Sequence, residues 1–227
     1  MLGGTGSLLG PSPNALFSMV VEFLKTHLPI FAESVSKTDI ENEPGLNSRL
    51  SRFITNAAAQ EIFFANESME DETYGNSPKA DIGIFLKMED TGIDPPEITV
   101  FEGKRLTTKL PSERRREYVI GHEKDGKSVP CGGMERFKLS IHARRLKHAG
   151  MIGYIQDDTP GNWRGKINTW ISDLSRQRHE PAWSEQEQLT PLATDGSVTE
   201  CRSIVCRKGD ELHLTHLWVD LSRPDTR

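Results

Sequence analysis

The sequence predicts an α/β domain with a mixed central sheet and helices on both of its faces. Apolar residues recur at helical or strand spacing in the order helix, three strands, helices, strand, helix and hairpin. The composition, 35% hydrophobic and 27% charged, is that of a soluble globular chain. The 227 residues are enough to bury a core without a disulfide or metal staple, so one elaborated domain is expected.

The first forty residues are expected to hold a loose segment and one helix. The opening is rich in Gly and Pro, and Asn14 can cap a helix that runs to about Ser34. One apolar stripe follows this helix: Leu16, Met19, Val20, Phe23 and Leu24. Because Glu22, Lys25 and His27 interrupt the apolar stretch, it predicts a helix packed on the core or on a partner, not a membrane span.

Residues 41–180 are expected to form the core. A helix is expected to begin near Glu43 and Pro44, since proline suits a first helical turn. Strand patterns then follow at residues 61–65, 80–86 and 97–104. The last two strands flank a turn signal at residues 88–96, which predicts an antiparallel hairpin.

The rest of the chain completes the α/β pattern. In chain order we expect a charged helix at 111–121, a helix at 134–148, a buried strand at 149–156, a helix at 162–176, a linker at 181–195, and a terminal hairpin built from 201–206 and 212–219. The linker and hairpin, residues 181–227, are expected to pack on the core.

The charge is unevenly distributed along the chain. The formal net charge is −5, but residues 101–150 carry 13 basic and 6 acidic side chains. Residues 1–100 carry 6 basic and 15 acidic ones. Such a basic block is typical of a surface that binds a polyanion.

The cysteines and histidines give little sign of a metal or disulfide framework. Cys131, Cys201 and Cys206 are odd in number and lack C-x-x-C spacing, which fits a reducing, cytoplasmic setting. His213 and His216 are three residues apart on an expected strand, so they should face opposite sides.

Two carboxylates and a lysine mark a candidate site. Asp81 begins one expected strand, and Glu102 and Lys104 end its hairpin partner. Residues two apart on a strand share a face, and antiparallel pairing can place Asp81 opposite Glu102. Adjacent carboxylates favour a cation, and Mg²⁺ (or Mn²⁺) suits an open site with oxygen ligands. Such a metal, with Lys104 to hold the water or the phosphate, is the combination that phosphodiester hydrolysis requires.

These residues resemble the restriction-endonuclease-like PD-(D/E)XK nuclease superfamily. The resemblance implies a core of helix, three antiparallel strands, helix and strand, covering about residues 41–156. It assigns Asp81 and Glu102 to the two acidic motif positions and Lys104 to the motif lysine. Ala80 stands where many members have proline. The implied activity is that of a magnesium-dependent endonuclease, with DNA as the first expected substrate and defence of bacteria against foreign DNA as its commonest setting.

Further implications of the resemblance concern ligands and partners. Glu43 matches an extra metal ligand that some members carry on the preceding helix, with Glu41 as its competitor. A homodimer or a larger complex is expected, because cutting duplex DNA often needs two active sites. The N-terminal helix and the terminal hairpin are the expected contact elements. Independently of the resemblance, no membrane partner is expected, because charged residues interrupt the longest apolar stretch.

Four basic side chains of the charged block are the expected nucleic-acid contacts: Arg105, Arg136, Lys138 and Arg144. Contacts of this kind bind phosphates with strong salt dependence and little sequence preference. Arg136 is the favoured candidate because it follows the Gly132–Gly133 elbow closely.

Three alternatives stay open. Glu102 and Lys104 can form an ordinary salt bridge at a strand end, and a second acid-x-Lys triplet occurs at 125–127. A subunit with the same fold can bind nucleic acid without cutting it. Residues 121–128 also match the G-x4-G-K-[ST] phosphate loop of nucleotide hydrolases, but Pro130 and two glycines follow where that loop needs a helix.

Overall fold

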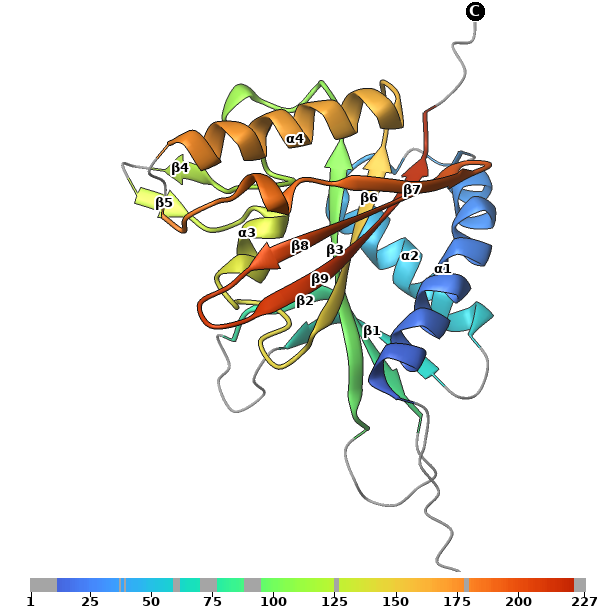
Figure 1. Ribbon diagram of the computed structural model, residues 1–227. Helices are drawn as coiled ribbons and strands as arrows, with labels where there is room; N and C mark the ends of the chain where they lie inside the picture. The colour runs from blue at the N-terminus through green and yellow to red at the C-terminus, as the bar shows by residue number, and fades with distance from the viewer. Residues whose placement is uncertain are drawn as a thin grey trace, which may run out of the picture.

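The described part of the chain is an α/β fold with a seven-stranded mixed open sheet and four α-helices (Figure 1). This computed structural model describes residues 12–36, 38, 40–58, 62–69, 77–87, 95–124, 127–177 and 180–222. Most of the loose opening, and residues 88–94 of the expected turn, lie outside these ranges.

The main helices and strands follow the expected order. The helices are α1 (Pro13–Ser36), α2 (Glu43–Ala57), α3 (Gly133–Lys138) and α4 (Pro160–Arg176), with 3-10 turns η1 (Ser112–Arg114) and η2 (Glu185–Glu187). The strands are β1 (Ile62–Met69), β2 (Lys79–Leu86), β3 (Glu97–Leu106), β4 (His122–Lys124), β5 (Lys127–Val129), β6 (His148–Ile155), β7 (Thr190–Asp195), β8 (Val198–Cys206) and β9 (Glu211–Asp220). The strands β4, β5 and β7 are not among the expected elements, and no α-helix occupies residues 111–121.

The strand order in the sheet is β1-β2-β3-β6-β9-β8-β7. The strands β1, β2 and β3 pair antiparallel, β3, β6 and β9 pair parallel, and β9, β8 and β7 pair antiparallel. The expected terminal hairpin is β8–β9, and it belongs to the sheet itself, because β9 lies directly beside β6. The strands β4 and β5 form a separate small hairpin.

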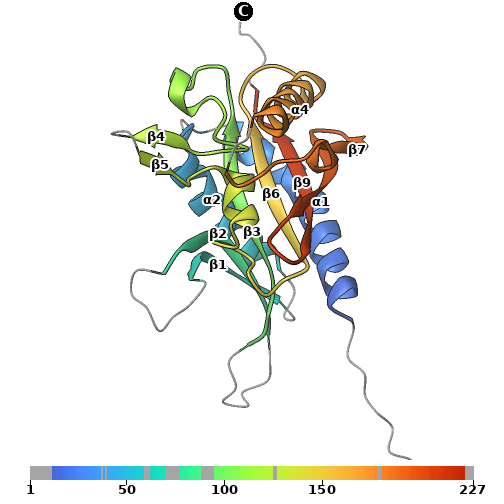
Figure 2. The same ribbon diagram turned by 60° about the vertical axis from the view of Figure 1, so that its left-hand side comes forward.

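Helices cover both faces of the sheet (Figure 2). On one face α1 and α2 bury an apolar cluster that includes Leu24, Phe31, Leu50, Phe101 and Tyr154. On the other face α3 and α4 enclose a second cluster that includes Phe137, Met151, Trp163, Ile167 and Trp218. The sheet is therefore the middle layer of three, as the sequence predicts.

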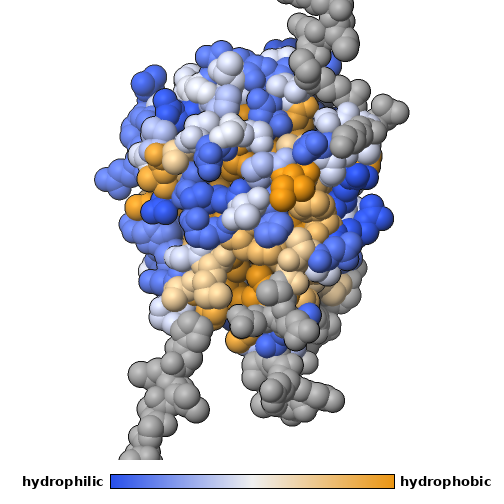
Figure 3. Space-filling model, turned by 90° about the vertical axis from the view of Figure 1, so that its right-hand side faces the viewer, coloured by the Kyte–Doolittle hydropathy of each residue, from blue (hydrophilic) through white to orange (hydrophobic). Residues whose placement is uncertain are grey.

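Helix α1 packs along one face of the sheet and leaves part of its own surface apolar. Eight of its residues are buried, while Met19 and Ile30 are about half exposed. Apolar side chains are accordingly visible among polar ones on this side of the molecule (Figure 3). By length and composition alone α1 could also cross a membrane, a property that buried core helices share.

The prediction of a charged helix at residues 111–121 is wrong. The structure has only the short turn η1 there, followed by irregular turns. The carbonyl groups of Glu117, Tyr118 and Val119 accept hydrogen bonds from the backbone N–H groups of residues 133–135. These carbonyls are committed to the first turn of α3, so they cannot extend a helix of their own.

The helix expected at residues 134–148 is too long. It ends at Lys138, and Ser140 and Ala143 just beyond have positive φ angles of 54° and 56°. Arg207 holds this irregular segment by donating to the carbonyl oxygens of Ala143 (2.8 Å) and Leu146 (3.1 Å). The segment thus folds back over the sheet instead of continuing as a helix.

The linker expected at residues 181–195 contains ordered structure. It holds η2 and the edge strand β7, and Glu187 in η2 is fully buried. The carboxylate of Glu187 accepts two hydrogen bonds from the ammonium group of Lys138, at 2.6 and 2.9 Å. This buried ion pair joins the segment to α3.

Candidate functional site

The site lies where strands β2 and β3 separate. Their ladder ends at the pair Ile82–Phe101, although β2 stays paired with β1 as far as Lys79 and β3 stays paired with β6 as far as Leu106. The two strands therefore form a fork in the sheet. Beyond Phe101, the backbone of β3 has no strand partner on the β2 side, so side chains can bind its N–H and C=O groups there.

Asp81 occupies the fork from the β2 side. Extending the antiparallel register by one residue places it opposite Glu102, as the sequence predicts. Its Oδ2 accepts a hydrogen bond of 2.8 Å from the backbone N–H of Gly103. The Asp81 carboxylate thus replaces the missing strand-to-strand bond and is fixed beside the two motif residues of β3.

Glu102, Lys104 and Glu43 form an ion-pair cluster in this fork. The Lys104 Nζ lies 3.1 Å from Glu102 Oε1 and 2.8 Å from Glu43 Oε1. Glu102 is 0% exposed and Lys104 is 5% exposed. Of the two candidates for the extra acid, Glu43 is therefore the one whose side chain contacts the cluster.

The position of Glu43 follows from how α2 begins and where it packs. Asn42 caps the helix by accepting a hydrogen bond from Gly45 N–H (2.9 Å), which leaves Glu43 in the first turn. One turn later, Asn47 packs directly against Gly103, and a side chain at position 103 would collide with it. Asn47 is held there by the Tyr154 hydroxyl, which donates to its Oδ1 at 2.8 Å.

Arg136 and His142, from α3 and the segment after it, also contact Glu102. The Nη1 of Arg136 donates to Glu102 Oε1 at 2.7 Å. The Nε2 of His142 lies 3.5 Å from Glu102 Oε2 and 3.4 Å from Arg136 Nη1. Arg136 comes from α3 and His142 from the irregular segment after it, so the shortened helix brings both to the fork. No spacing in the sequence indicates His142.

The pKa of Asp81 is raised from 3.8 to about 7, mainly because the carboxyl group is buried and also because Glu102 is near. Lys104 lowers this pKa only in part. Asp81 therefore titrates close to neutral pH, which is a common property of carboxyl groups in functional sites.

The other charges of the cluster are set by its ion pairs. Burial would lower the pKa of Lys104, but the carboxylates of Glu102, Glu43 and Asp81 outweigh it and raise that pKa. Burial would raise the pKa of Glu102, but Lys104, His142 and Arg136 hold it below its usual value. Burial lowers the pKa of His142 to about 4, so its ring is neutral at pH 7.

Two carboxylate oxygens of the cluster have no hydrogen-bond donor of their own in the described part of the chain. Glu43 Oε2 and Glu102 Oε2 are buried and accept no hydrogen bond from the described residues. Carboxylate oxygens are the ligands that Mg²⁺ and Mn²⁺ prefer. As they stand, the acids surround Lys104, and no three His, Cys, Asp or Glu side chains among the described residues are grouped closely enough to hold a metal.

The four expected nucleic-acid contacts lie in different surroundings. Arg136 is at the cluster, Arg105 follows Lys104 on β3, and Arg144 is exposed. The expectation that Lys138 contacts nucleic acid is wrong. Its ammonium group is buried against Glu187 and the carbonyl oxygen of Cys206, so it is not available to a ligand.

The alternative phosphate loop lacks the geometry that it needs. Within residues 121–128, the described parts are Gly121, strand β4 and the first two residues of β5, and the two strands pair antiparallel. Residues 125 and 126 lie outside the described part of the chain. A phosphate loop requires a helix directly after Lys127 and Ser128, and here those two residues belong to a strand.

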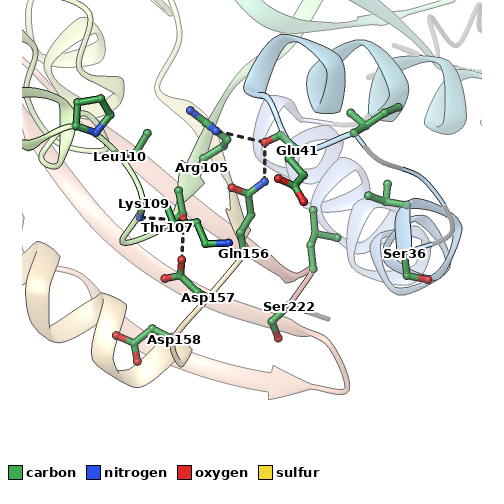
Figure 4. A pocket seen from close by; sticks show the side chains of 14 residues that line it. Ser36, Glu41, Arg105, Thr107, Lys109, Leu110, Gln156, Asp157, Asp158 and Ser222 are labelled. Atoms are coloured by element: carbon green, nitrogen blue, oxygen red, sulfur yellow. Dashed lines mark hydrogen bonds between the residues drawn. The ribbon is translucent and has the colours of Figure 1, made fainter. Parts of the chain in front are cut away.

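A pocket of about 690 Å³ opens at the carboxyl ends of β3, β6 and β9, and Arg105, which follows Lys104 on β3, is in its lining. Figure 4 shows Arg105, Gln156 and Asp157 around its centre, with Leu110 on one side and Ser36 on the other. The backbone carbonyl of Glu41 joins two of its walls, because it accepts hydrogen bonds from Gln156 Nε2 (2.6 Å) and Arg105 Nη1 (3.4 Å).

Comparisons with known proteins give no relative: no family model, no curated protein and no solved structure matches this chain.

Proposed function

We propose that the protein is a metal-dependent nuclease that hydrolyses phosphodiester bonds at the fork between β2 and β3. The observation that carries this proposal is the convergence of Asp81, Glu102 and Lys104 at the end of one strand ladder. Glu43 completes the group with a carboxylate from the preceding helix. A strand-end salt bridge needs one acid and one base, whereas Lys104 pairs with two carboxylates and the Gly103 N–H fixes a third, Asp81, beside them.

The order of elements supports a restriction-endonuclease-like core. Helix α2, the antiparallel strands β1, β2 and β3, helix α3 and the parallel strand β6 follow one another as that core requires. The first acid is on the second strand of this unit, and the other acid and the lysine are on the third. We propose that the helix α1 and the antiparallel unit of β7, β8 and β9 are additions to this core.

Each residue of the cluster has a task in this proposal. Asp81 and Glu102, with Glu43, would hold Mg²⁺ or Mn²⁺, which supplies an acidified water and stabilises negative charge on the phosphate. Lys104 holds the water or the phosphate by its ammonium group. His142 is a positioning residue that keeps Glu102 oriented.

Arg136 is the proposed phosphate contact. Its Nη1 bonds Glu102, and its side chain is 28% exposed, so the rest of the guanidinium group can reach a ligand. We expect Arg136→Ala to lower the cleavage rate about 100-fold and to reduce the salt dependence of binding by about one charge. Arg176→Ala, at an exposed arginine that ends α4 and lies outside both the cluster and the basic block, is the control and should leave the rate within about threefold. Equal rates for wild type and Arg136→Ala would remove Arg136 from the site.

The experiment for the proposal is a substrate panel. Plasmid DNA, single-stranded DNA and RNA are incubated with wild-type protein in Mg²⁺, Mn²⁺ or EDTA, together with Asp81→Asn. We expect metal-dependent cutting, with DNA as the best substrate, and no cutting by Asp81→Asn. Tight nucleic-acid binding without cutting would favour the non-cutting subunit instead.

The setting of the activity is part of the proposal. A cytoplasmic nuclease that acts on foreign DNA fits the free thiols of Cys131, Cys201 and Cys206. A second copy of the chain, or a larger complex, would dock on α1, where Met19 and Ile30 are exposed.

A further inference from the structure

The pocket at the carboxyl ends of β3, β6 and β9 has the dimensions of a ligand site. Its volume of about 690 Å³ falls within the range of roughly 300–1,000 Å³ that small-molecule pockets usually have. In open α/β sheets, ligands bind in the crevice beyond the carboxyl ends of the strands. Arg105 of β3, Gln156 after β6 and Ser222 after β9 stand at this edge (Figure 4).

The pocket shares two chain segments with the catalytic cluster. Arg105 directly follows Lys104 on β3, and Glu41 stands two residues before Glu43. Neighbouring residues of a strand face opposite sides, so Lys104 joins the cluster while Arg105 lines the pocket. The same stretch of β3 therefore supplies both sites, with Lys104 on one side of the strand and Arg105 on the other.

The polar atoms of the pocket offer both a donor and an acceptor. The Nε of Arg105 is buried and has no acceptor among the described residues. The amide nitrogen of Gln156 donates to the carbonyl oxygen of Glu41, and within the described ranges no donor reaches its amide oxygen. Such a mixed pair matches the edge of a nucleobase, which presents donors and acceptors side by side.

The charges of the pocket argue against a polyphosphate. Asp157 accepts hydrogen bonds from Thr107 Oγ1 (2.6 Å) and Thr108 N–H (2.9 Å), and Asp158 is paired with Lys166 at 2.7 Å. With Glu41, the lining has three carboxylates against the cations of Arg105 and Lys109. A neutral ligand suits this balance better than several phosphates.

The apolar part of the wall completes the match to a nucleoside. Ile40, Leu110 and Leu221 line the pocket together with the polar residues, so a flat base can be buried against them. No aromatic side chain is among the lining residues that the structure describes. A base bound here would leave the stack of its own strand and would pack on aliphatic side chains, not on an aromatic ring.

We propose that this pocket holds one nucleoside, base and sugar, of the strand whose phosphate lies at Asp81, Glu102 and Lys104. The proposal rests on the nuclease function proposed above. A base paired inside a duplex cannot enter a pocket without leaving its stack. The enzyme should therefore prefer strands with an unpaired nucleotide beside the scissile bond.

The test uses full-length protein and a set of 12-nucleotide strands, each of which carries 2-aminopurine at a different position. The protein is added in EDTA, and the fluorescence of single-stranded DNA, of RNA and of duplex DNA is measured. Ser36→Trp fills the pocket from the exposed end of α1. Thr26→Trp, exposed on the same helix and outside the pocket lining, is the matched control.

We expect wild type and Thr26→Trp to raise the fluorescence of a single strand at least twofold at one or two positions, because the base leaves its stack. Ser36→Trp should abolish this rise and, in Mn²⁺, lower single-strand cutting at least tenfold. The DNA and RNA arms show which sugar is accepted. No rise at any position, or an equal rise with Ser36→Trp, would overturn the pocket proposal.

The two proposals fail in different ways. Intact cutting with no fluorescence rise rejects the nucleoside pocket and leaves the nuclease standing. No cutting of any substrate rejects the nuclease, and with it a pocket that serves a cleaved strand.

Discussion

Replacing Lys104 with Met is expected to destabilise the protein by about 3–5 kcal/mol, because it leaves Glu43 without its cation and buried Glu102 with Arg136 alone. Lys104 is 5% exposed and lies within hydrogen-bond distance of Glu102 and Glu43. Methionine has a similar length and an apolar stem, so the variant removes the charge and little of the packing. Urea unfolding at pH 8 measures the loss.

The matched control for this variant is Lys147→Met. Lys147 also forms an ion pair, with Asp210 at 3.0 Å, but its side chain is 67% exposed. Exposed pairs contribute at most about 1 kcal/mol. Equal losses for the two variants would show that the fork is open to water and not the buried cluster described above. The loss for Lys104→Met should also be smaller at pH 5, where buried carboxylates without a partner are neutralised more easily.

Replacing Asp81 with Asn is expected to stabilise the protein above pH 7 while abolishing cleavage. The pKa of Asp81 is about 7 in the folded state against 3.8 in the unfolded state. Between these values the folded protein keeps a proton that the unfolded chain has released, so stability falls as the pH rises from about 4 to about 7. The amide side chain of the Asp81→Asn variant does not titrate, so the variant escapes this loss.

The size of the Asp81 effect follows from the same pKa difference. A difference of about three pKa units corresponds to about 4 kcal/mol of folding free energy for a fully buried group. The Asp81 side chain is partly exposed, so the expected gain in stability for Asp81→Asn is about 2 kcal/mol at pH 8. The gain should vanish near pH 4. Unfolding midpoints across this range measure it, and a gain that does not depend on pH would contradict the raised pKa. Mg²⁺ should stabilise wild type at pH 8 and leave the variant unaffected.

Most of the site could be predicted from local patterns. The period-two alternation of strands places Glu102 and Lys104 on one face, and the hairpin turn sets Asp81 opposite Glu102. Pro44 marks the first turn of a helix, which is why Glu43 could be named as a candidate. These inferences need only neighbouring segments of the chain.

The remaining contacts depend on distant segments and have no local signal. Helix α3 ends at Lys138, whose ammonium group is buried against Glu187, 49 residues away. Arg136 and His142 reach Glu102 because the chain turns back after that point. The position of β9 beside β6 is likewise decided by tertiary pairing, since its sequence alone indicates only a hairpin.

The measurement that tests the central claim most directly is cleavage of single-stranded DNA in Mn²⁺ by wild type, Glu102→Gln and Lys127→Ala. Glu102→Gln keeps the shape of the cluster and removes one charge, while Lys127→Ala disables both the second acid-x-Lys triplet and the phosphate-loop match. We expect wild type and Lys127→Ala to cut at similar rates and Glu102→Gln to be at least about 1,000-fold slower, a loss of about 4 kcal/mol in transition-state stabilisation. Full activity of a folded Glu102→Gln variant, or loss of activity with Lys127→Ala alone, would contradict the assignment of the site to the fork between β2 and β3.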